Sequence, residues 1–153
     1  MDMFGAIRRR IRNIEAASIA DMLQALFSDP GIAGLILDLN TEGQLFAGID
    51  AKNKELASIG GAYAAYTVRL KRAKGQVADR VTLKDTGDFY RSFDLIVGHD
   101  SITITADSEK GGVDLQLRWG SELLRLTDAS KMELFEGLIP ELKKMLLQKI
   151  HGK

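Results

Sequence analysis

At 153 residues the chain is long enough to bury one hydrophobic core, and we expect a single domain spanning 1–153. Apolar residues make up 45% and charged residues 27% of the sequence, which argues against wholesale disorder. The 21 Lys and Arg balance the 21 Asp and Glu, so the net charge points to neither nucleic acid nor an anionic membrane. Without cysteine the sequence offers no disulfide or thiolate chemistry.

The N-terminal region predicts a long amphipathic helix over residues 1–28. Apolar residues recur there at three- and four-residue steps from Phe4 to Leu26, and Pro30-Gly31 marks its end. No apolar signal-peptide core is visible, and the longest apolar run, Ile32–Leu37, is far below the roughly 20 residues of a bilayer span. We therefore expect a soluble protein with no membrane partner. The helix carries four arginines that either face solvent or contact the phosphates of DNA: Arg8, Arg9, Arg10 and Arg12.

The next region, up to Gly75, is mixed. The type of the short apolar stretch Ile32–Asn40 is ambiguous, and Gln44–Asp50 is compatible with a strand after a turn. Leu56–Ala73 has helical spacing but contains Gly60-Gly61, which predicts a loose or broken helix. Three basic residues before Gly75 predict the C-terminus of this helix: Lys71, Arg72 and Lys74. Their side chains either face solvent or contact phosphate.

The stretch from Val81 to Gly120 predicts an antiparallel β-meander. Its first strand is expected over Phe89–Val97, and its second alternates apolar and polar residues over Ser101–Ala106. The third strand is expected over Val113–Trp119, after a turn at Glu109–Gly112. Short turns containing glycine require neighbouring strands to run antiparallel.

The C-terminal region predicts a helix over residues 128–151, capped by Thr127 or Asp128. Pro140 predicts a kink or break after Gly137, because proline lacks the helical donor. The fold class is therefore α+β. It combines a long N-terminal helix, a mixed region with a central antiparallel meander over 44–120, and a C-terminal helix packed on the sheet.

Asp85-Thr86-Gly87 matches the catalytic triplet of aspartic proteases, in which two aspartates share one proton. A chain of this size needs to dimerise to supply the second aspartate. Lys84 stands where that family has an apolar strand, so the simpler interpretation is a turn in which Gly87 takes a positive φ. The only histidines, His99 and His151, do not predict a metal pair, and no cofactor motif is present.

The segment Leu83–Phe93 also resembles the start of the β-sheet in tail-completion and head–tail joining proteins of tailed phages, a group also described as virion morphogenesis or minor structural proteins. In that pattern a Thr-Gly pair precedes an apolar residue and then a serine. Gln44–Asp50, followed by Tyr66-Thr67, is similar to a variant from phages of the Bacteroidota. The matching residues are Thr86, Gly87, Phe89 and Ser92.

This resemblance implies a non-enzymatic structural protein of the virion neck or tail terminus, made in the host cytoplasm and without a cofactor. It implies a homo-oligomeric ring that contacts other neck or tail proteins, with Thr86 and Gly87 shaping the start of the strand. A ring also suits a meander, because free sheet edges invite pairing with another chain. Two alternatives stay open: a dimeric aspartic protease using Asp85, and a small nucleic-acid-binding or regulatory module using the basic N-terminal helix.

Overall fold

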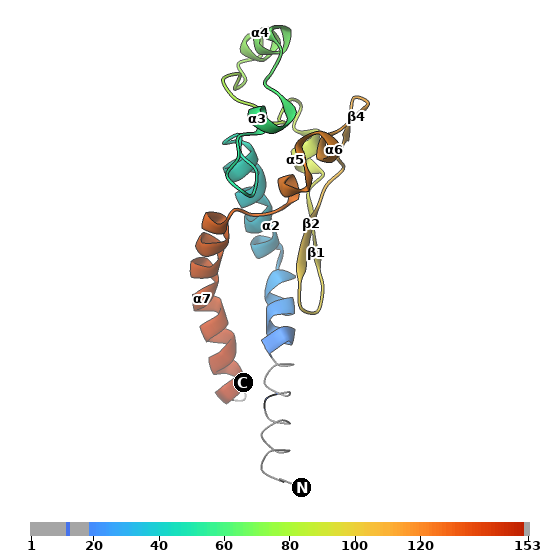
Figure 1. The fold of residues 1–153 in the computed structure, drawn as a ribbon. Helices are drawn as coiled ribbons and strands as arrows, with labels where there is room; N and C mark the ends of the chain where they lie inside the picture. Colours follow the sequence, from blue (N-terminus) through green and yellow to red (C-terminus); the bar gives the residue numbers. More distant parts are fainter. Residues whose placement is uncertain (1–11, 13–18, 152–153) are drawn as a thin grey trace.

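The computed structural model describes Arg12 and residues 19–151. Within this part the protein is α+β, with two small antiparallel sheets and a long C-terminal helix (Figure 1). After a helical segment at Ile19–Phe27, the elements follow in this order: α2 (Pro30–Asp38), the π-helix η1 (Leu39–Leu45), α3 (Leu56–Gly60), α4 (Ala65–Ala73), α5 (Asp88–Arg91), β1 (Asp94–Val97), β2 (Ile102–Thr105), β3 (Glu109–Lys110), β4 (Val113–Asp114), α6 (Leu115–Trp119), the 3-10 helix η2 (Ser121–Leu124) and α7 (Asp128–His151).

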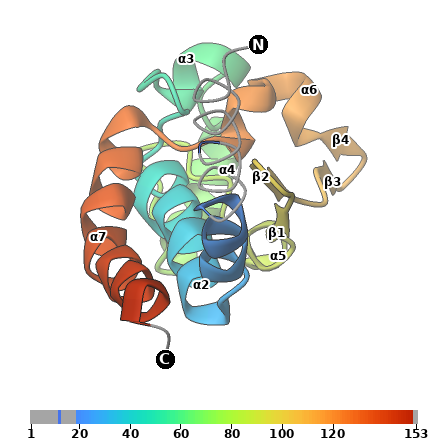
Figure 2. The same cartoon turned by 90° about the horizontal axis from the view of Figure 1, so that it is seen from below.

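The described part is elongated. Helix α4 lies at one end, while α7, the Ile19–Phe27 helix and the β1–β2 hairpin all extend toward the other end (Figure 1). Seen along this axis, α2 lies between α7 and β1 (Figure 2). The core lies in the middle of the molecule, where Ile36, Leu45, Leu56 and Leu123 are fully buried. Below this core, the described part consists of three elements that extend from it: α7, the Ile19–Phe27 helix and the β1–β2 hairpin (Figure 1).

The predicted N-terminal helix over 1–28 lies mostly outside the described residues, which show helix at Ile19–Phe27. The ambiguous stretch Ile32–Asn40 is helical, with all but its last two residues in α2 and those two in η1. The Asp29 side chain caps this helix by accepting from the N–H groups of Gly31 and Ile32 at 2.9 and 3.2 Å, and Pro30 occupies its first turn. The strand predicted over Gln44–Asp50 is wrong. Most of that stretch belongs to η1 and the turn after it, because η1 continues directly from α2.

Two buried polar side chains of η1 bind the segment that precedes α7. Gln44 Nε2 donates to the carbonyl of Arg125 at 2.9 Å, and Gln44 Oε1 accepts from the backbone N–H of Thr127 at 2.9 Å. Asn40 Nδ2 donates to the same Arg125 carbonyl at 2.8 Å. We call Asn40 and Gln44 the amide clamp. It fixes the start of α7 to the core, because buried backbone groups need these partners.

The predicted meander is wrong in its first strand. Gly87, at φ 85°, leads into the one-turn helix α5, and β1 begins only at Asp94. Phe89, Tyr90 and Phe93 are all buried and make edge-to-face contacts, with ring centroids 5.0 to 6.5 Å apart. A strand would point Phe89 and Tyr90 to opposite faces, whereas a helical turn places all three rings in one core.

The central hairpin is as predicted. Strands β1 and β2 pair antiparallel, with Leu95 opposite Ile104 and Val97 opposite Ile102. Strands β3 and β4 form a separate hairpin around Gly111-Gly112, both at positive φ, so the described part contains two sheets of two strands.

The predicted third strand of the meander is wrong after Asp114. The Asp114 side chain caps α6 by accepting from the N–H groups of Gln116 and Leu117. Leu115 and Trp119 are buried at i and i+4, while Leu117 is 86% exposed. In a strand all three would share one face, and in a helix they do not. The apolar alternation of the sequence is therefore compatible with both structures.

The predicted C-terminal helix is confirmed as α7, and the predicted broken helix is confirmed as α3 and α4. Thr127 caps α7, with its Oγ1 accepting from the Ser130 N–H at 3.1 Å. The break predicted after Gly137 is wrong, since α7 continues through Pro140. Glu136 and Pro140 are exposed, so water can bond the carbonyl that loses its helical partner.

Replacing Gln44 with Ala is expected to lower the free energy of unfolding by about 2–3 kcal/mol, because the buried N–H of Thr127 loses its partner. Urea unfolding followed by the fluorescence of Trp119, the chain's one tryptophan, measures this change. Gln148→Ala, at an exposed position of α7, is the control and should change stability by less than about 0.5 kcal/mol. Equal effects of the two substitutions would contradict a structural role for the clamp.

Candidate interaction surface

The four residues of the Thr-Gly motif lie together around α5. Thr86 Oγ1 bonds the Asp88 carboxylate, and Gly87 supplies the predicted positive φ before the helix. The Phe89 ring is in the core, while Ser92 Oγ donates to the Phe89 carbonyl at 2.7 Å and accepts from the Asp107 N–H at 3.0 Å. All these bonds stay within the chain. The motif therefore shapes the turn into β1, and its hydroxyls are occupied by local contacts.

Asp85 is an ion-paired surface carboxylate. Its Oδ1 lies 3.1 Å from Lys74 Nζ, and its side chain is about half exposed. The hydrogen bond from Lys74 holds the pKa of Asp85 below the usual 3.8, and the positive charge of Lys110 adds to this effect. A protease dyad instead requires two carboxylates that share a proton. The geometry of Asp85 gives no support to the protease alternative.

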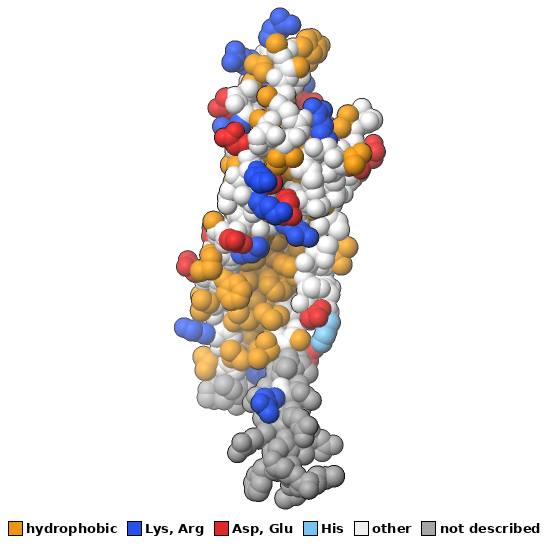
Figure 3. Space-filling view, in the orientation of Figure 1, with side chains coloured by type: hydrophobic (Ala, Val, Ile, Leu, Met, Phe, Trp, Pro, Cys, Tyr) orange, Lys and Arg blue, Asp and Glu red, His pale blue; other side chains and the backbone are white. Residues whose placement is uncertain are grey.

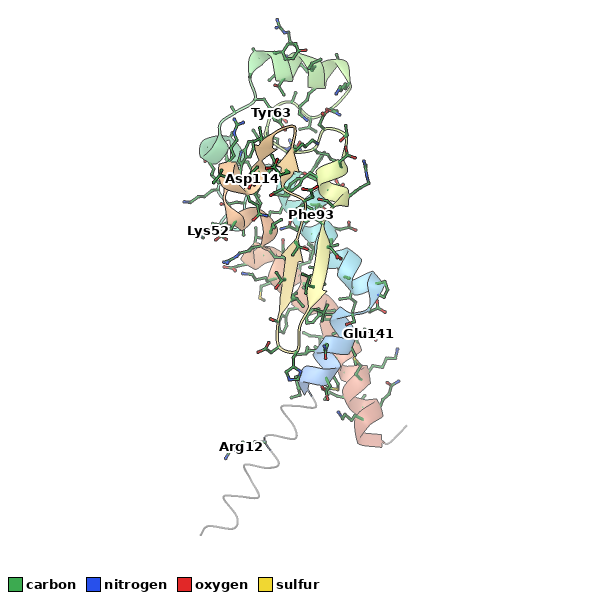
Figure 4. All side chains as sticks on the ribbon, turned by 90° about the vertical axis from the view of Figure 1, so that its right-hand side faces the viewer. Arg12, Lys52, Tyr63, Phe93, Asp114 and Glu141 are labelled. Carbon is green, nitrogen blue, oxygen red and sulfur yellow. The ribbon has the colours of Figure 1, made fainter. Side chains whose placement is uncertain are left out.

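The predicted basic contacts are spread over the molecule. Arg8, Arg9 and Arg10 lie outside the described residues, and Arg12 is exposed (Figure 4). Arg72 and Lys74 are exposed near the end of α4. Lys71 differs, since it is only 5% exposed and its Nζ donates to the Lys84 carbonyl at 2.5 Å. The solvated face predicted for these cations is therefore wrong for Lys71, whose ammonium holds two segments together.

The histidine and acidic side chains of the described part bear on metal binding, and its helices bear on membrane crossing. His99 is exposed in the β1–β2 turn, and no three His, Cys, Asp or Glu side chains of residues 12 and 19–151 come together as a metal site. No single described helix is long and apolar enough to cross a membrane. The pair Ile19–Phe27 and Pro30–Leu45 has the length and composition together, but it is bent by 72°.

Helix α7 carries two neighbouring apolar stripes. One stripe contains Leu134 and Leu138, which are buried in the core. Counting 100° per residue places the other stripe beside it, and this stripe is left uncovered. Its members Met132 and Phe135 are 62% and 65% exposed. We call this the outer stripe of α7, formed by Met132, Phe135, Ile139 and Leu146.

A groove separates α7 from β2. It has a volume of about 1340 Å³ and is lined by Leu134, Phe135 and Leu138 on one side and by residues 102–106 on the other, with Phe27 between them. Figure 3 shows the apolar side chains gathered over this lower half of the molecule, above the residues drawn in grey. The outer stripe and the groove form one continuous apolar surface. We call this surface the α7 face.

The α7 face is large enough for stable association. Helix α7 has 24 residues, which gives a length of about 36 Å, and two helices side by side are about 20 Å wide. The product, about 700 Å², is an upper bound on the footprint that a partner can cover, and it is of the same order as the roughly 800 Å² that each partner buries in a standard interface. Contiguous uncovered apolar patches mark interaction sites in soluble proteins. The arrangement is suited to binding another protein surface.

The sequence predicted the helix over residues 128–151 but not its uncovered surface. The number of apolar residues in this helix is the sequence signal for that surface. Eight apolar residues fall on one side of a helix drawn at 100° per residue: Met132, Phe135, Leu138, Ile139, Leu142, Met145, Leu146 and Ile150. A helix on the edge of a core buries an arc of about 100°, and this set is wider.

Comparisons with known proteins give no match. No family model, no curated protein and no solved structure is significantly similar to this chain.

Asp85→Asn is expected to lower stability at pH 7 by no more than about 1 kcal/mol, because the Lys74 pair is half exposed and screened by solvent. The folded-state pKa of Asp85 is lowered, so its contribution is complete above the unfolded value of 3.8 and is lost as the pH falls through the folded value. Wild type and variant should therefore unfold alike at lower pH, measured by urea titrations at a series of pH values.

Asp79→Asn is the control for this comparison. Asp79 is also ion-paired, with Arg80, but its carboxylate is 75% exposed, so solvent screens that pair more strongly. A larger loss for Asp79→Asn than for Asp85→Asn would contradict the assignment. Cleavage of a peptide by wild type that Asp85→Asn abolishes would establish the protease alternative.

Proposed function

We propose that this protein is a non-enzymatic structural subunit that assembles with copies of itself into a closed ring. The observation that supports this is the uncovered α7 face. A monomer that leaves Phe135 and Met132 in water gains nothing from their exposure, whereas burial yields about 25 cal/mol for each Å² of apolar area. The occupant of the face is another copy of this chain.

Charge supports a copy of the same chain as partner. The chain carries as many acidic as basic residues, so two copies meet without long-range repulsion. The groove is lined by charged residues of both signs, which are paired with one another within the chain, so the groove carries little net charge to repel a second copy. These charged residues are Lys52, Glu122, Arg125, Asp128 and Lys131.

The shape of the face favours a ring. The outer stripe is a projecting helix surface, while the groove beside it is a recess along the free edge of β2, which pairs only with β1 among the described strands. A projection and a recess on one subunit permit head-to-tail contacts, and such contacts close into rings when the rotation allows it. Pairing at the edge of β2 also removes the aggregation risk of a free strand.

The resemblance of Leu83–Phe93 supports the proposal that this ring belongs to the neck or tail terminus of a tailed phage, as a head–tail joining or tail-completion protein. Other neck or tail proteins are then its neighbours in the virion. The arginines at positions 8, 9, 10 and 12 are available for a passing contact with DNA in the lumen or with an acidic neighbour.

A double substitution in the outer stripe, Phe135→Asp with Ile139→Asp, is expected to weaken self-association by about 100-fold or more, because two carboxylates would be buried in an apolar contact. Sedimentation velocity over a wide concentration range measures the effect. Wild type should reach a multiple of 16.8 kDa, and the double variant should stay monomeric at the same concentrations.

Leu117→Asp is the matched control, since Leu117 is 86% exposed on α6 and belongs neither to the outer stripe nor to the lining of the groove, so it should leave assembly unchanged. Circular dichroism verifies that each variant folds. The proposal is wrong if wild type stays monomeric at every concentration, or if the double variant assembles as well as Leu117→Asp.

A further inference from the structure

A second recess lies away from the α7 face, between α4, the segment around Lys84, and β3. It has a volume of about 210 Å³. Tyr63, one of its lining residues, is at the end of the molecule near α4, opposite the free ends of α7 and the hairpin (Figure 4). Four lysines line it, accompanied by one carboxylate, Asp85. We call it the lysine pocket, after Lys71, Lys74, Lys84 and Lys110.

Two of the four ammonium groups have carboxylate partners. Lys74 Nζ lies 3.1 Å from Asp85 Oδ1, and Lys84 Nζ lies 2.5 Å from Glu42 Oε1. Within each pair the positive and negative charges neutralise each other. They also hold Lys74 and Lys84 at the edge of the pocket.

The other two ammonium groups have no carboxylate partner among the described residues. Lys71 is buried and bonds only the Lys84 carbonyl and, at 3.4 Å, the Gln76 Oε1 atom, with its Nζ 5.0 Å from the centre of the Tyr63 ring. Lys110 Nζ is buried and has no hydrogen-bond partner in this part of the chain. A buried ammonium is costly unless an anion contacts it. The positive charge of Lys110 acts on the carboxylates of Asp85 and Asp88, but neither Lys110 nor Lys71 is in direct contact with a carboxylate of the described residues.

The backbone at the pocket wall is strained. Leu83, which lines the pocket, has φ 55°, in the left-handed region that a leucine rarely adopts. Neighbouring bonds hold it there, from Lys71 Nζ to the Lys84 carbonyl and from the Lys84 N–H to Thr82 Oγ1 at 3.3 Å. Such conformations concentrate at ligand sites, where the surrounding structure enforces them.

We propose that the lysine pocket binds a phosphate monoester carried on a small apolar or aromatic body. A phosphate monoester has a charge of about −1.5 to −2 at pH 7, which matches the two unpaired ammonium groups, whereas a single carboxylate neutralises only one. Lysine ammonium groups bind phosphate as point charges. The remaining lining is mostly apolar and fits an apolar ester group: Tyr63, Leu70, Leu83 and Leu115. This proposal does not depend on ring assembly.

Isothermal titration of the full-length protein with phenyl phosphate tests the proposal, with phenol, benzoate and inorganic phosphate as comparison ligands. Phenyl phosphate should bind at one site per chain and more tightly than the other three. Absence of saturable binding at millimolar phenyl phosphate would overturn the proposal. If benzoate bound equally well, the claim that the pocket selects a dianion would be overturned. If inorganic phosphate bound equally well, the claim that the pocket also binds an apolar ester group would be overturned.

Lys110→Met tests the site itself and should weaken phenyl phosphate binding by about 10- to 100-fold, the effect of losing a charged hydrogen bond. Its unliganded form should unfold at the same temperature as wild type or higher, because the substitution removes a buried unpaired charge. Lys143→Met, at an exposed position of α7, is the control and should bind like wild type. Equal binding by both variants would place the ligand elsewhere and overturn the proposal.

Discussion

The amide clamp is the constraint on which the rest of this structure depends. Asn40 and Gln44 are buried in a π-helix, and between them they bond the carbonyl of Arg125 and the N–H of Thr127. These bonds set the position at which α7 leaves the core. Because Thr127 is also the N-cap of α7, the same residue fixes the start of the helix and its attachment.

An attachment at one end explains why the α7 face is open. Among the α7 residues whose burial is described, Leu134 and Leu138 in the first half are buried, while Leu142 and Met145 are partly buried against the core. Beyond them the helix continues to His151 beside the Ile19–Phe27 helix, with the groove between α7 and β2 (Figures 1 and 3). The inner stripe therefore holds α7 against the core, and the outer stripe remains available to a neighbouring subunit.

Local chemistry in the sequence predicted the helices whose ends are marked by caps or glycines, and the hairpin whose turn is short. Thr127 at the start of α7, Gly60-Gly61 between α3 and α4, and the alternation of Ile102 and Ile104 are such signals. The failures share one cause. Phe89–Phe93 and Val113–Trp119 have apolar spacings that suit both a strand and a helical turn, and burial of the aromatic rings and of Trp119 decided between them. The candidate surfaces were harder to foresee, because the exposure of Phe135 and the missing hydrogen-bond partner of Lys110 Nζ depend on contacts between distant segments.

Amide hydrogen exchange of the full-length protein, measured in dilute and in concentrated solution, tests most directly whether copies of the chain cover the α7 face. The account predicts that protection rises with concentration in α7 and in β2, whose free edge gains partners, and stays constant in α4 at the opposite end. Exchange in α7 and β2 that is independent of concentration would contradict it, as would a rise in protection confined to α4.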